Sequence, residues 1–162
     1  MKQRLKAWGD TKIVPIVCVF IFNESGELLL LQRHTEDLGG GQWGTPGGRI
    51  EPDESTEVAI CRELFEETGI KNLELTLLGA HYIHMPHGTV HMTSYRAVMP
   101  PGVGVVLDPE EHHGYAWLPL NSLLSKHNIL WGIPTVLRDF RLLGGFDVDP
   151  TLADGSTVEL LG

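Results

Sequence analysis

Three glutamates lie close together in the stretch RELFEETGI, at Glu63, Glu66 and Glu67. On a helix with about 100° per residue they share an arc of about 100°, because positions i, i+3 and i+4 lie on one face. Clustered carboxylate oxygens suit hard cations such as Mg²⁺ or Mn²⁺. A solvated acidic surface gives the same pattern, since repulsion at these spacings costs only about 0.3 kcal/mol per pair. The helical wheel alone leaves both interpretations open.

The residues around the glutamates predict a single helix. Ser55 is a suitable N-cap, Glu57 is an acidic first-turn residue, and Gly69 can end the helix in a left-handed conformation. Arg62 lies beside Glu66 on the wheel. The apolar residues fall on the side away from the glutamates, and we expect that side to face the core; they are Val58, Ile60, Cys61, Leu64 and Phe65.

The charge of the chain is concentrated in the same region. The net charge is −9, from 21 acidic and 12 basic residues. An acidic chain repels polyanions, which argues against a long nucleic acid as partner. Residues 48–70 contain seven of the 21 acids and only Arg49 and Arg62 in return, and so account for −5 of the −9. Most of the acidity is therefore local to this segment, and any phosphate substrate would need a cation or locally placed arginines.

Two strands are expected upstream of this segment. The run IVPIVCVFIF at Ile13–Phe22 is rich in β-branched residues and precedes a turn at residues 23–26, and Leu28–Arg33 predicts the next strand. Ten residues are too few to span a membrane as a helix. Basic residues precede the run as in a signal peptide, but Asp10 and the lack of a small-residue cleavage site argue against secretion.

A glycine-rich segment connects these strands to the acidic helix. Six glycines lie between residues 39 and 48, with Trp43 and Pro46 among them. We expect neither a helix nor a central strand there, but a backbone that can approach a ligand closely. Further elements are predicted downstream from alternation, turn residues and Pro134 at a helix start: strands at Leu73–Ile83, Val90–Val98, Tyr115–Leu118 and Thr157–Leu161, and helices at Pro119–Lys126 and Pro134–Leu143.

No linker, repeat or low-complexity segment divides the chain, so residues 1–162 predict one mixed α/β domain, with a core at about 13–143 and an uncertain tail at 146–162. Cys18 and Cys61 provide neither a disulfide framework nor a zinc ligand set. This usage favours a reducing compartment, and we expect a cytoplasmic protein without a membrane anchor. The apolar residues 129–133 are a candidate homodimer interface or a part of the core.

The spacing within Gly48–Ile70 distinguishes between the two interpretations of the acidic helix. Gly48, five residues, Glu54, seven residues and then RELFEETGI resemble the complete Nudix signature, G-x5-E-x7-R-E-U-x-E-E-x-G-U with U aliphatic, without a departure. At background residue frequencies a chance match has a probability of about one in 10⁹ per start point. The lead-in from Trp43 to Gly48 and the region from Glu111 to Trp117 are similar to the family as well.

The resemblance implies a Nudix-type α/β/α sandwich with a mixed β-sheet, and hydrolysis of nucleoside diphosphates linked to another moiety with the help of Mg²⁺ or Mn²⁺. It implies that Glu63, Glu66 and Glu67 are metal ligands and that the Gly48 carbonyl reaches a metal. Arg62 would orient the carboxylates, and Gly69 would be structural. Glu54 would either support the metal ligands without touching the metal or be an auxiliary ligand, and a small phosphate substrate would arrive with its metal.

The general base is less closely defined by the resemblance. Relatives often have a catalytic or metal-binding acid at the place of Glu111, which lies six residues before Trp117. Glu110 and His112 are neighbouring candidates. An ordinary acidic loop would look the same, because surface loops are commonly polar.

Substrate contacts are expected from basic and aromatic residues. Arg33, Arg49 and Arg96 are the candidates for a cleft, since guanidinium groups bind phosphate in a bidentate manner; a surface ion pair is the alternative for each. Trp43 is a candidate for stacking on a base, although a tryptophan beside glycines more often anchors a loop. A histidine group at positions 81, 84, 87 and 91 lines the cleft or decorates a hairpin, and strand alternation argues against a zinc site.

Markers of individual substrate classes are mostly negative. The proline that ADP-ribose hydrolases have fifteen residues after the box is replaced by Met85, and the tyrosine of dinucleoside-polyphosphate hydrolases is missing from residues 86–88. The arginine pattern of the coenzyme A type begins at Arg33 but is not completed at Leu38. A nucleoside triphosphate is therefore the leading substrate, as in MutT-like members. The alternatives are a sugar-nucleotide or ADP-ribose hydrolase, or a non-catalytic Nudix module that binds nucleotides.

Overall fold

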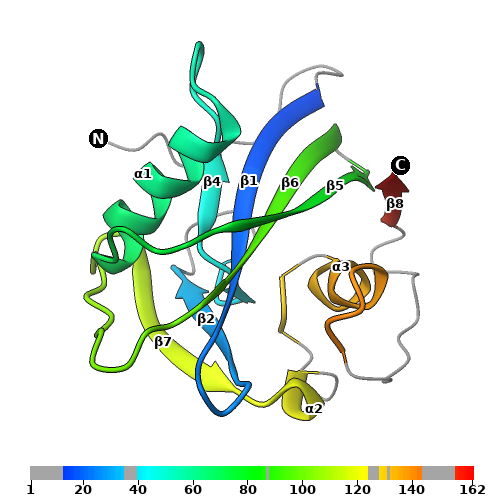
Figure 1. Cartoon of the computed structure of the whole chain (residues 1–162). Coiled ribbons are helices and arrows are strands. Elements are labelled where there is room, and N and C mark those ends of the chain that lie inside the picture. The colour runs from blue at the N-terminus through cyan, green and yellow to red at the C-terminus, as the bar shows by residue number, and fades with distance from the viewer. Residues whose placement is uncertain (1–12, 35–39, 87, 124–127, 131, 144–155) are drawn as a thin grey trace.

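The computed structural model describes residues 13–34, 40–86, 88–123, 128–130, 132–143 and 156–162. In these ranges the chain forms a mixed sheet with helices on both faces (Figure 1). The elements in chain order are β1 (Ile13–Phe22), β2 (Leu28–Arg33), β3 (Trp43–Gly44), β4 (Gly47–Arg49), α1 (Thr56–Thr68), β5 (Thr76–Met85), β6 (Gly88–Val98), β7 (His112–Leu118), α2 (Leu120–Leu123), α3 (Ile133–Asp139) and β8 (Thr157–Leu161).

Strand β1 organises the sheet. It pairs in parallel with β6 along its whole length, and β6 continues through β5 to β8 at the edge. On its other side β1 pairs first with β4 and, at Phe22, with β2, which in turn pairs with β3 and β7. The parallel and antiparallel pairs together make the sheet mixed, which confirms the expected α/β sandwich.

The apolar run of β1 is explained by burial on both faces. Val17, Val19 and Ile21 enter the core beneath α1, together with Ile60 and Leu64 of that helix. The alternate residues of the strand enter a second core that includes residues of α3; its members include Cys18, Phe20, Phe22, Val136 and Leu137. The sheet thus separates two apolar cores, each covered by one helix.

The caps predicted for α1 are confirmed. The Ser55 hydroxyl accepts a hydrogen bond from the Val58 amide at 3.2 Å. Gly69 ends the helix at a φ of 72°, and its amide donates to the Phe65 carbonyl. Both groups satisfy backbone atoms that the helix leaves unpaired at its ends. Local sequence alone therefore fixes where this helix begins and ends.

The face that α1 turns inward differs from the expected one. Val58 is 58% exposed and Phe65 48% exposed, and Cys61 is exposed as well. Glu63 and Glu67 are buried instead, at 3% and 4% exposure, beside Ile60 and Leu64. The prediction for Val58, Cys61 and Phe65 was wrong because it placed all three glutamates on the side of the helix away from the core. Two of the three belong to the side that faces the sheet.

The glycine-rich segment contains short strands, contrary to expectation. β4 pairs antiparallel with residues 16–18 of β1 in the centre of the sheet. A side chain at Gly47 would collide with the Val17 carbonyl and with the backbone of Cys18. Glycine permits this pairing because it has no Cβ, so the same property that weakens a strand allows a close approach here.

Other boundaries shift by a few residues. β5 begins three residues later than predicted, β7 begins three residues earlier, and α3 ends at Asp139, with Arg141 at a φ of 58° shortly after it. The predicted helix Pro119–Lys126 forms at Leu120–Leu123, while residues 124–127 and the tail 146–155 lie outside the described residues. The predicted strand Thr157–Leu161 is confirmed.

Residues 129–133 were expected to form an interface or part of the core. Ile133 is buried, and Ile129 and Leu130 pack against the core beneath α3. Residue 131 is outside the described part of the chain. Among the described residues, no helix is long and apolar enough to cross a membrane.

Candidate active site and metal centre

The guanidinium group of Arg62 connects acidic residues of α1 with Glu54 in the loop before it. Arg62 Nε and Nη2 donate to the two carboxylate oxygens of Glu54 at 2.7 and 2.8 Å, which makes this pair bidentate. Arg62 Nη1 donates to Glu63 Oε1 at 2.9 Å and lies 3.5 Å from Glu66 Oε2. Arg62 Nη2 also donates to the Arg49 carbonyl at 3.1 Å. One side chain thereby fixes three carboxylates relative to β4.

These contacts change the protonation equilibria. The hydrogen bonds from Arg62 lower the pKa of Glu54 to about 2. The same bonds to Glu54 raise the pKa of Arg62 above its ordinary value, so the guanidinium stays charged. Both partners of this pair are ionised at every pH at which the protein would work. The position of Glu54 is therefore set by charge as well as by geometry.

Gly48 lies against the buried carboxylate of Glu63. A Cβ at Gly48 would overlap both carboxylate oxygens of Glu63, which is only 3% exposed. The backbone of β4 can thus run directly over the acidic group only because residue 48 has no side chain. The Glu63 carboxylate is therefore packed directly against the backbone of β4 at Gly48.

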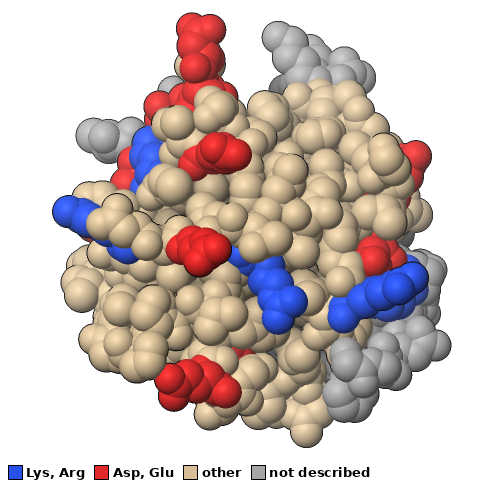
Figure 2. Space-filling view, in the orientation of Figure 1, with Lys and Arg blue, Asp and Glu red and all other residues tan. Residues whose placement is uncertain are grey.

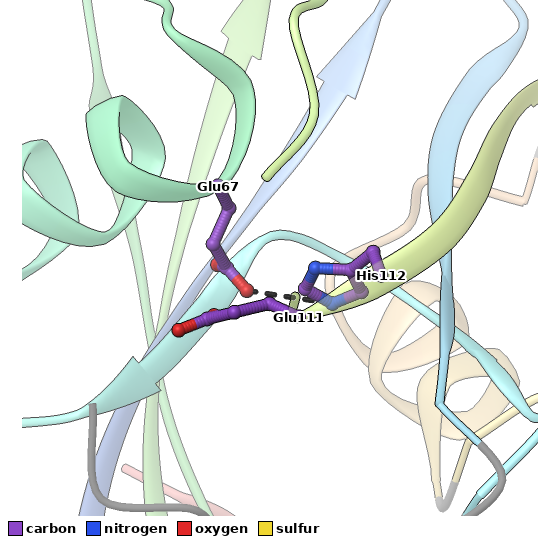
Figure 3. Close-up of side chains that lie close together, drawn as sticks. All are labelled: Glu67, Glu111 and His112. Atoms are coloured by element: carbon purple, nitrogen blue, oxygen red, sulfur yellow. Dashed lines mark ion pairs between the residues drawn. The ribbon is translucent and has the colours of Figure 1, made fainter. Parts of the chain in front are cut away.

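Glu67 connects α1 to the start of β7. Its Oε1 accepts a hydrogen bond from the Gly47 amide at 2.8 Å, and its Oε2 lies 3.5 Å from His112 Nε2. Glu111 joins them, since one donor atom from each of the three side chains lies within 4.8 Å of the others. Figure 3 shows Glu67 on the helix meeting His112 at the start of β7 and Glu111 just before it. Glu67 and His112 are buried, whereas Glu111 is half-buried.

The arginines expected to bind substrate are placed differently from one another. Arg33 lies at the end of β2, where it pairs with His112. Arg49 ends β4; its carbonyl binds Arg62, and its buried Nε has no hydrogen-bond partner among the described residues. Arg96 lies with its guanidinium carbon 5.5 Å from the centre of the Phe22 ring, a side chain of the core away from α1. The structure groups Arg33 and Arg49 with the acidic site and leaves Arg96 on the other face.

Trp43 takes a position typical of an anchor. It is half-buried and packs against the core beneath α3. Its amide donates to the Asn128 carbonyl at 2.8 Å, and its carbonyl accepts from the Leu130 amide at 2.7 Å. These contacts attach the glycine-rich segment to the chain that leads into α3.

The histidine group of the β5–β6 hairpin does not converge. His81 is buried and its Nε2 lies 3.0 Å from Asp139 Oδ2 of α3, while burial lowers its pKa. His84 is exposed and contacts Glu159 Oε2 of β8 at 3.0 Å. His91 packs edge-on against the Tyr82 ring, and residue 87 lies outside the described residues. In the part of the chain that the structure describes, these side chains connect separate elements.

His112 is the site residue that the sequence identified least clearly. It entered only as a neighbour of Glu111, because the predicted strand began at Tyr115. The observed strand begins at His112, so that this residue pairs with Arg33 and its side chain is only 9% exposed. The residues HHG at its start contain no apolar side chain and no alternation, so the sequence offered no strand signal before Tyr115.

Comparison with known proteins assigns the family. The family model described as NUDIX domain matches residues 12–140, which is most of the chain. The chain belongs to the Nudix family. As a Nudix hydrolase it acts on phosphoanhydride bonds, and hydrolases of this family generally use divalent metals.

Relatives of known name agree with this assignment. The CTP pyrophosphohydrolase of Escherichia coli (strain K12) is 30% identical over 106 residues, which are 65% of this chain and 76% of that protein. An 8-oxo-dGTP diphosphatase of Proteus vulgaris is 38% identical over 69 residues, which are 43% of this chain and 62% of that relative. The crystal structure of a MutT protein from Methanosarcina mazei Go1 superposes with a TM-score of 0.74 at 26% identity, covering 86% of this chain and all of that one.

Proposed function

We propose that this Nudix hydrolase is a pyrophosphohydrolase of nucleoside triphosphates that requires a divalent cation. Water attacks a phosphorus atom, one phosphoanhydride P–O bond breaks, and a nucleoside monophosphate, pyrophosphate and a proton are released. The observation that carries this proposal is the acidic cluster under β4, where Arg62 holds Glu54, Glu63 and Glu66 and the Gly47 amide holds Glu67. Such a cluster has the preorganisation that a cation site for phosphate chemistry needs.

The donor set fits a hard divalent cation. Carboxylates of Glu63, Glu66 and Glu67 and the carbonyl of Gly48 are oxygen donors, and Gly48 has no side chain that would fill the space at Glu63. Bound there, Mg²⁺ or Mn²⁺ would neutralise phosphate charge and lower the pKa of water. Arg62 contributes by orienting the carboxylates, and the anionic Glu54 keeps Arg62 in place. Both roles are positional, because neither side chain needs to touch the substrate.

Glu111 is our candidate for the general base. It is half-buried, and its carboxylate lies within reach of the Glu67 and His112 donor atoms. A base in this place can take a proton from a water beside the acidic cluster. If it does, Glu111→Gln lowers kcat and removes the acidic limb of the pH–rate profile; an unshifted profile would assign the proton transfer to another group.

Arg33 and Arg49 are the candidates for contacts with substrate phosphates. Arg33 pairs with His112 in the β2–β7 ladder, and Arg49 follows the two glycines that cover the acidic cluster. Arg96 and Trp43 remain candidates on the α3 side of the sheet, where Trp43 would contact a base with the exposed part of its ring. Charge on the two arginines would offset the repulsion that the net charge of −9 exerts on a phosphate.

The nature of the substrate is supported by the names of relatives. One relative is named for CTP and another for 8-oxo-dGTP, both of which are nucleoside triphosphates. A sugar nucleotide or ADP-ribose is the alternative substrate. A non-catalytic binding module would be expected to have lost box glutamates, whereas this chain has all of them.

A substrate panel tests the proposal directly. The protein is incubated with Mg²⁺ or Mn²⁺ and with canonical and oxidised nucleoside triphosphates, sugar nucleotides, ADP-ribose and dinucleoside polyphosphates, and the products are separated. We expect a triphosphate to yield its monophosphate and pyrophosphate, and chelation to stop the reaction. Faster cleavage of a sugar nucleotide or ADP-ribose would favour the alternative substrate, and binding without cleavage would favour the non-catalytic module.

The cellular compartment and the partners that we expect follow from the composition and from the free thiols. Cys18 is buried and Cys61 is exposed, and both are unpaired, as expected of a protein that works in the reducing cytoplasm. The partner is a small nucleotide rather than a long nucleic acid, because the chain is acidic. A homodimer stays a prediction, which a sizing column would test.

A further inference from the structure

The group of Glu67, Glu111 and His112 contains a nitrogen donor, which the sequence signature of the family does not include. The side chain of His112 is only 9% exposed and projects toward two carboxylates (Figure 3). It is therefore part of the interior of the site and not of an exposed acidic surface. Its Nε2 is the atom that faces Glu67.

The separation between His112 and Glu67 is informative. His112 Nε2 lies 3.5 Å from Glu67 Oε2, whereas a charge-assisted hydrogen bond between such groups is about 2.8 Å long. Two donors that bind one ion at about 2.1 Å each lie about 3.0 Å apart at the 90° of an octahedral ion and about 3.4 Å apart at 110°. The observed distance is thus too long for a strong hydrogen bond and close enough that a small adjustment makes both atoms ligands of one cation.

Glu67 and His112 are held from two separate elements, α1 and β7. Glu67 is fixed because its other oxygen, Oε1, accepts the Gly47 amide at 2.8 Å. His112 opens β7 and is paired with Arg33 of β2. Ligands on a helix and a paired strand keep their positions without a bound ion, which reduces the cost of ordering the site.

We propose that His112 is a metal ligand through Nε2, together with Glu67, and that this nitrogen makes the site prefer Mn²⁺ to Mg²⁺, while Glu111 beside them stays available as the general base. The inference rests on the proposed function, since it concerns the cation of the same site. Mg²⁺ prefers oxygen ligands and retains water, whereas imidazole binds transition metals well and Mn²⁺ accepts both donor types. His112 is therefore the residue that would set metal preference.

The test is a spectroscopic one on the full-length protein. Mn²⁺ is titrated and followed by electron paramagnetic resonance, and the bound ion is then examined by electron spin-echo envelope modulation. We expect modulation from one ¹⁴N nucleus, replaced by ¹⁵N modulation when the protein contains ¹⁵N-labelled histidine. His112→Gln should abolish the modulation and weaken Mn²⁺ binding at least about tenfold, with a smaller loss for Mg²⁺ measured by competition.

A matched control is His84→Gln. His84 also contacts a carboxylate, Glu159 at 3.0 Å, but it is exposed and lies on the β5–β8 edge. This variant should keep both the modulation and the Mn²⁺ affinity. Absence of nitrogen modulation from the wild-type Mn²⁺ complex would overturn the inference without any variant, and so would modulation that persists in a folded His112→Gln protein.

The inference and the proposed function fail in different ways. Mg²⁺-dependent hydrolysis of nucleotides without nitrogen coupling to Mn²⁺ would leave the function in place and remove His112 from the ligands. Nitrogen coupling without hydrolysis of any nucleotide in the panel would support His112 as a metal ligand and contradict the proposed pyrophosphohydrolase activity.

Discussion

At the scale of single residues, Arg62 determines the arrangement of the site. Its guanidinium contacts Glu54 with two hydrogen bonds and Glu63 with a third, and its side chain is 21% exposed. A planar fork can make these bonds at the same time, whereas an ammonium group offers one point of charge. The carboxylates depend on this side chain for both position and charge balance.

Arg62→Lys should therefore keep the charge but lose the geometry. We expect kcat/KM with Mg²⁺ to fall about tenfold to a hundredfold, and the free energy of unfolding to fall by about 1–3 kcal/mol. Steady-state kinetics and urea unfolding measure the two quantities. Arg138→Lys is the control, because Arg138 pairs with Asp139 on α3, away from the acidic cluster. Equal losses in both variants would contradict the special role of Arg62.

The low pKa of Glu54 predicts how stability depends on pH. The folded-state pKa of about 2 lies below the value of about 4.3 expected in the unfolded chain. The unfolded state then binds a proton first, so the stabilisation is fully present above about pH 4.5 and is lost as the pH falls toward 2. The free energy of unfolding should drop more steeply over this window in the wild type than in Glu54→Gln. Parallel curves for the two proteins would contradict the ion pair.

At the scale of elements, the sequence predicted the two ends of α1 but not the face that the helix buries. Its ends followed from Ser55 and Gly69, because capping is a local property. Its inward face did not follow, since burial of Glu63 and Glu67 depends on the glycines of β4 and on the distant residue His112. Strand β1 was likewise predicted from its apolar run. Its pairing with β4 was not predicted, because the glycines of β4 are not typical of a strand.

The corrected face of α1 leads to a prediction about stability. Both Val58 and Ile60 were expected in the core. Ile60 is fully buried there, whereas Val58 is 58% exposed. Val58→Ala should change the free energy of unfolding by less than about 0.5 kcal/mol, because alanine favours the helix and no packing is lost. Ile60→Ala should cost about 3 kcal/mol through the cavity it leaves. Similar losses for the two variants, measured by urea unfolding, would restore the original interpretation of the helix.

At the scale of the whole molecule, the distribution of charge suits a small substrate that carries a cation. Acidic side chains cover the loop that protrudes between β4 and α1, at the top of Figure 2, and they include Glu51 and Asp53. On the rest of the face shown, acidic and basic groups are interspersed. On the part of the chain that the structure describes, the face in Figure 2 has no extended basic surface, and with a net charge of −9 we expect no binding of a polyanion.

This pattern predicts how the rate responds to metal. At a fixed nucleotide concentration the rate should rise with Mg²⁺ until the nucleotide is saturated, and uncomplexed nucleotide should be a weak competitor, since the protein repels its charge. Initial rates over a grid of metal and nucleotide concentrations measure both effects. Strong inhibition by free nucleotide would contradict the expectation that substrate and metal arrive together.

The central claim is that the buried carboxylates of α1 support cation-dependent hydrolysis, and Glu67→Gln tests it most directly. The amide can still accept the Gly47 hydrogen bond, so the fold should be retained while the charge is lost. We predict that hydrolysis of the best triphosphate with Mg²⁺ slows by about a thousandfold, or about 4 kcal/mol, whereas Glu57→Gln, an exposed first-turn change on the same helix, leaves it unaltered. Hydrolysis by Glu67→Gln at close to the wild-type rate would contradict the account.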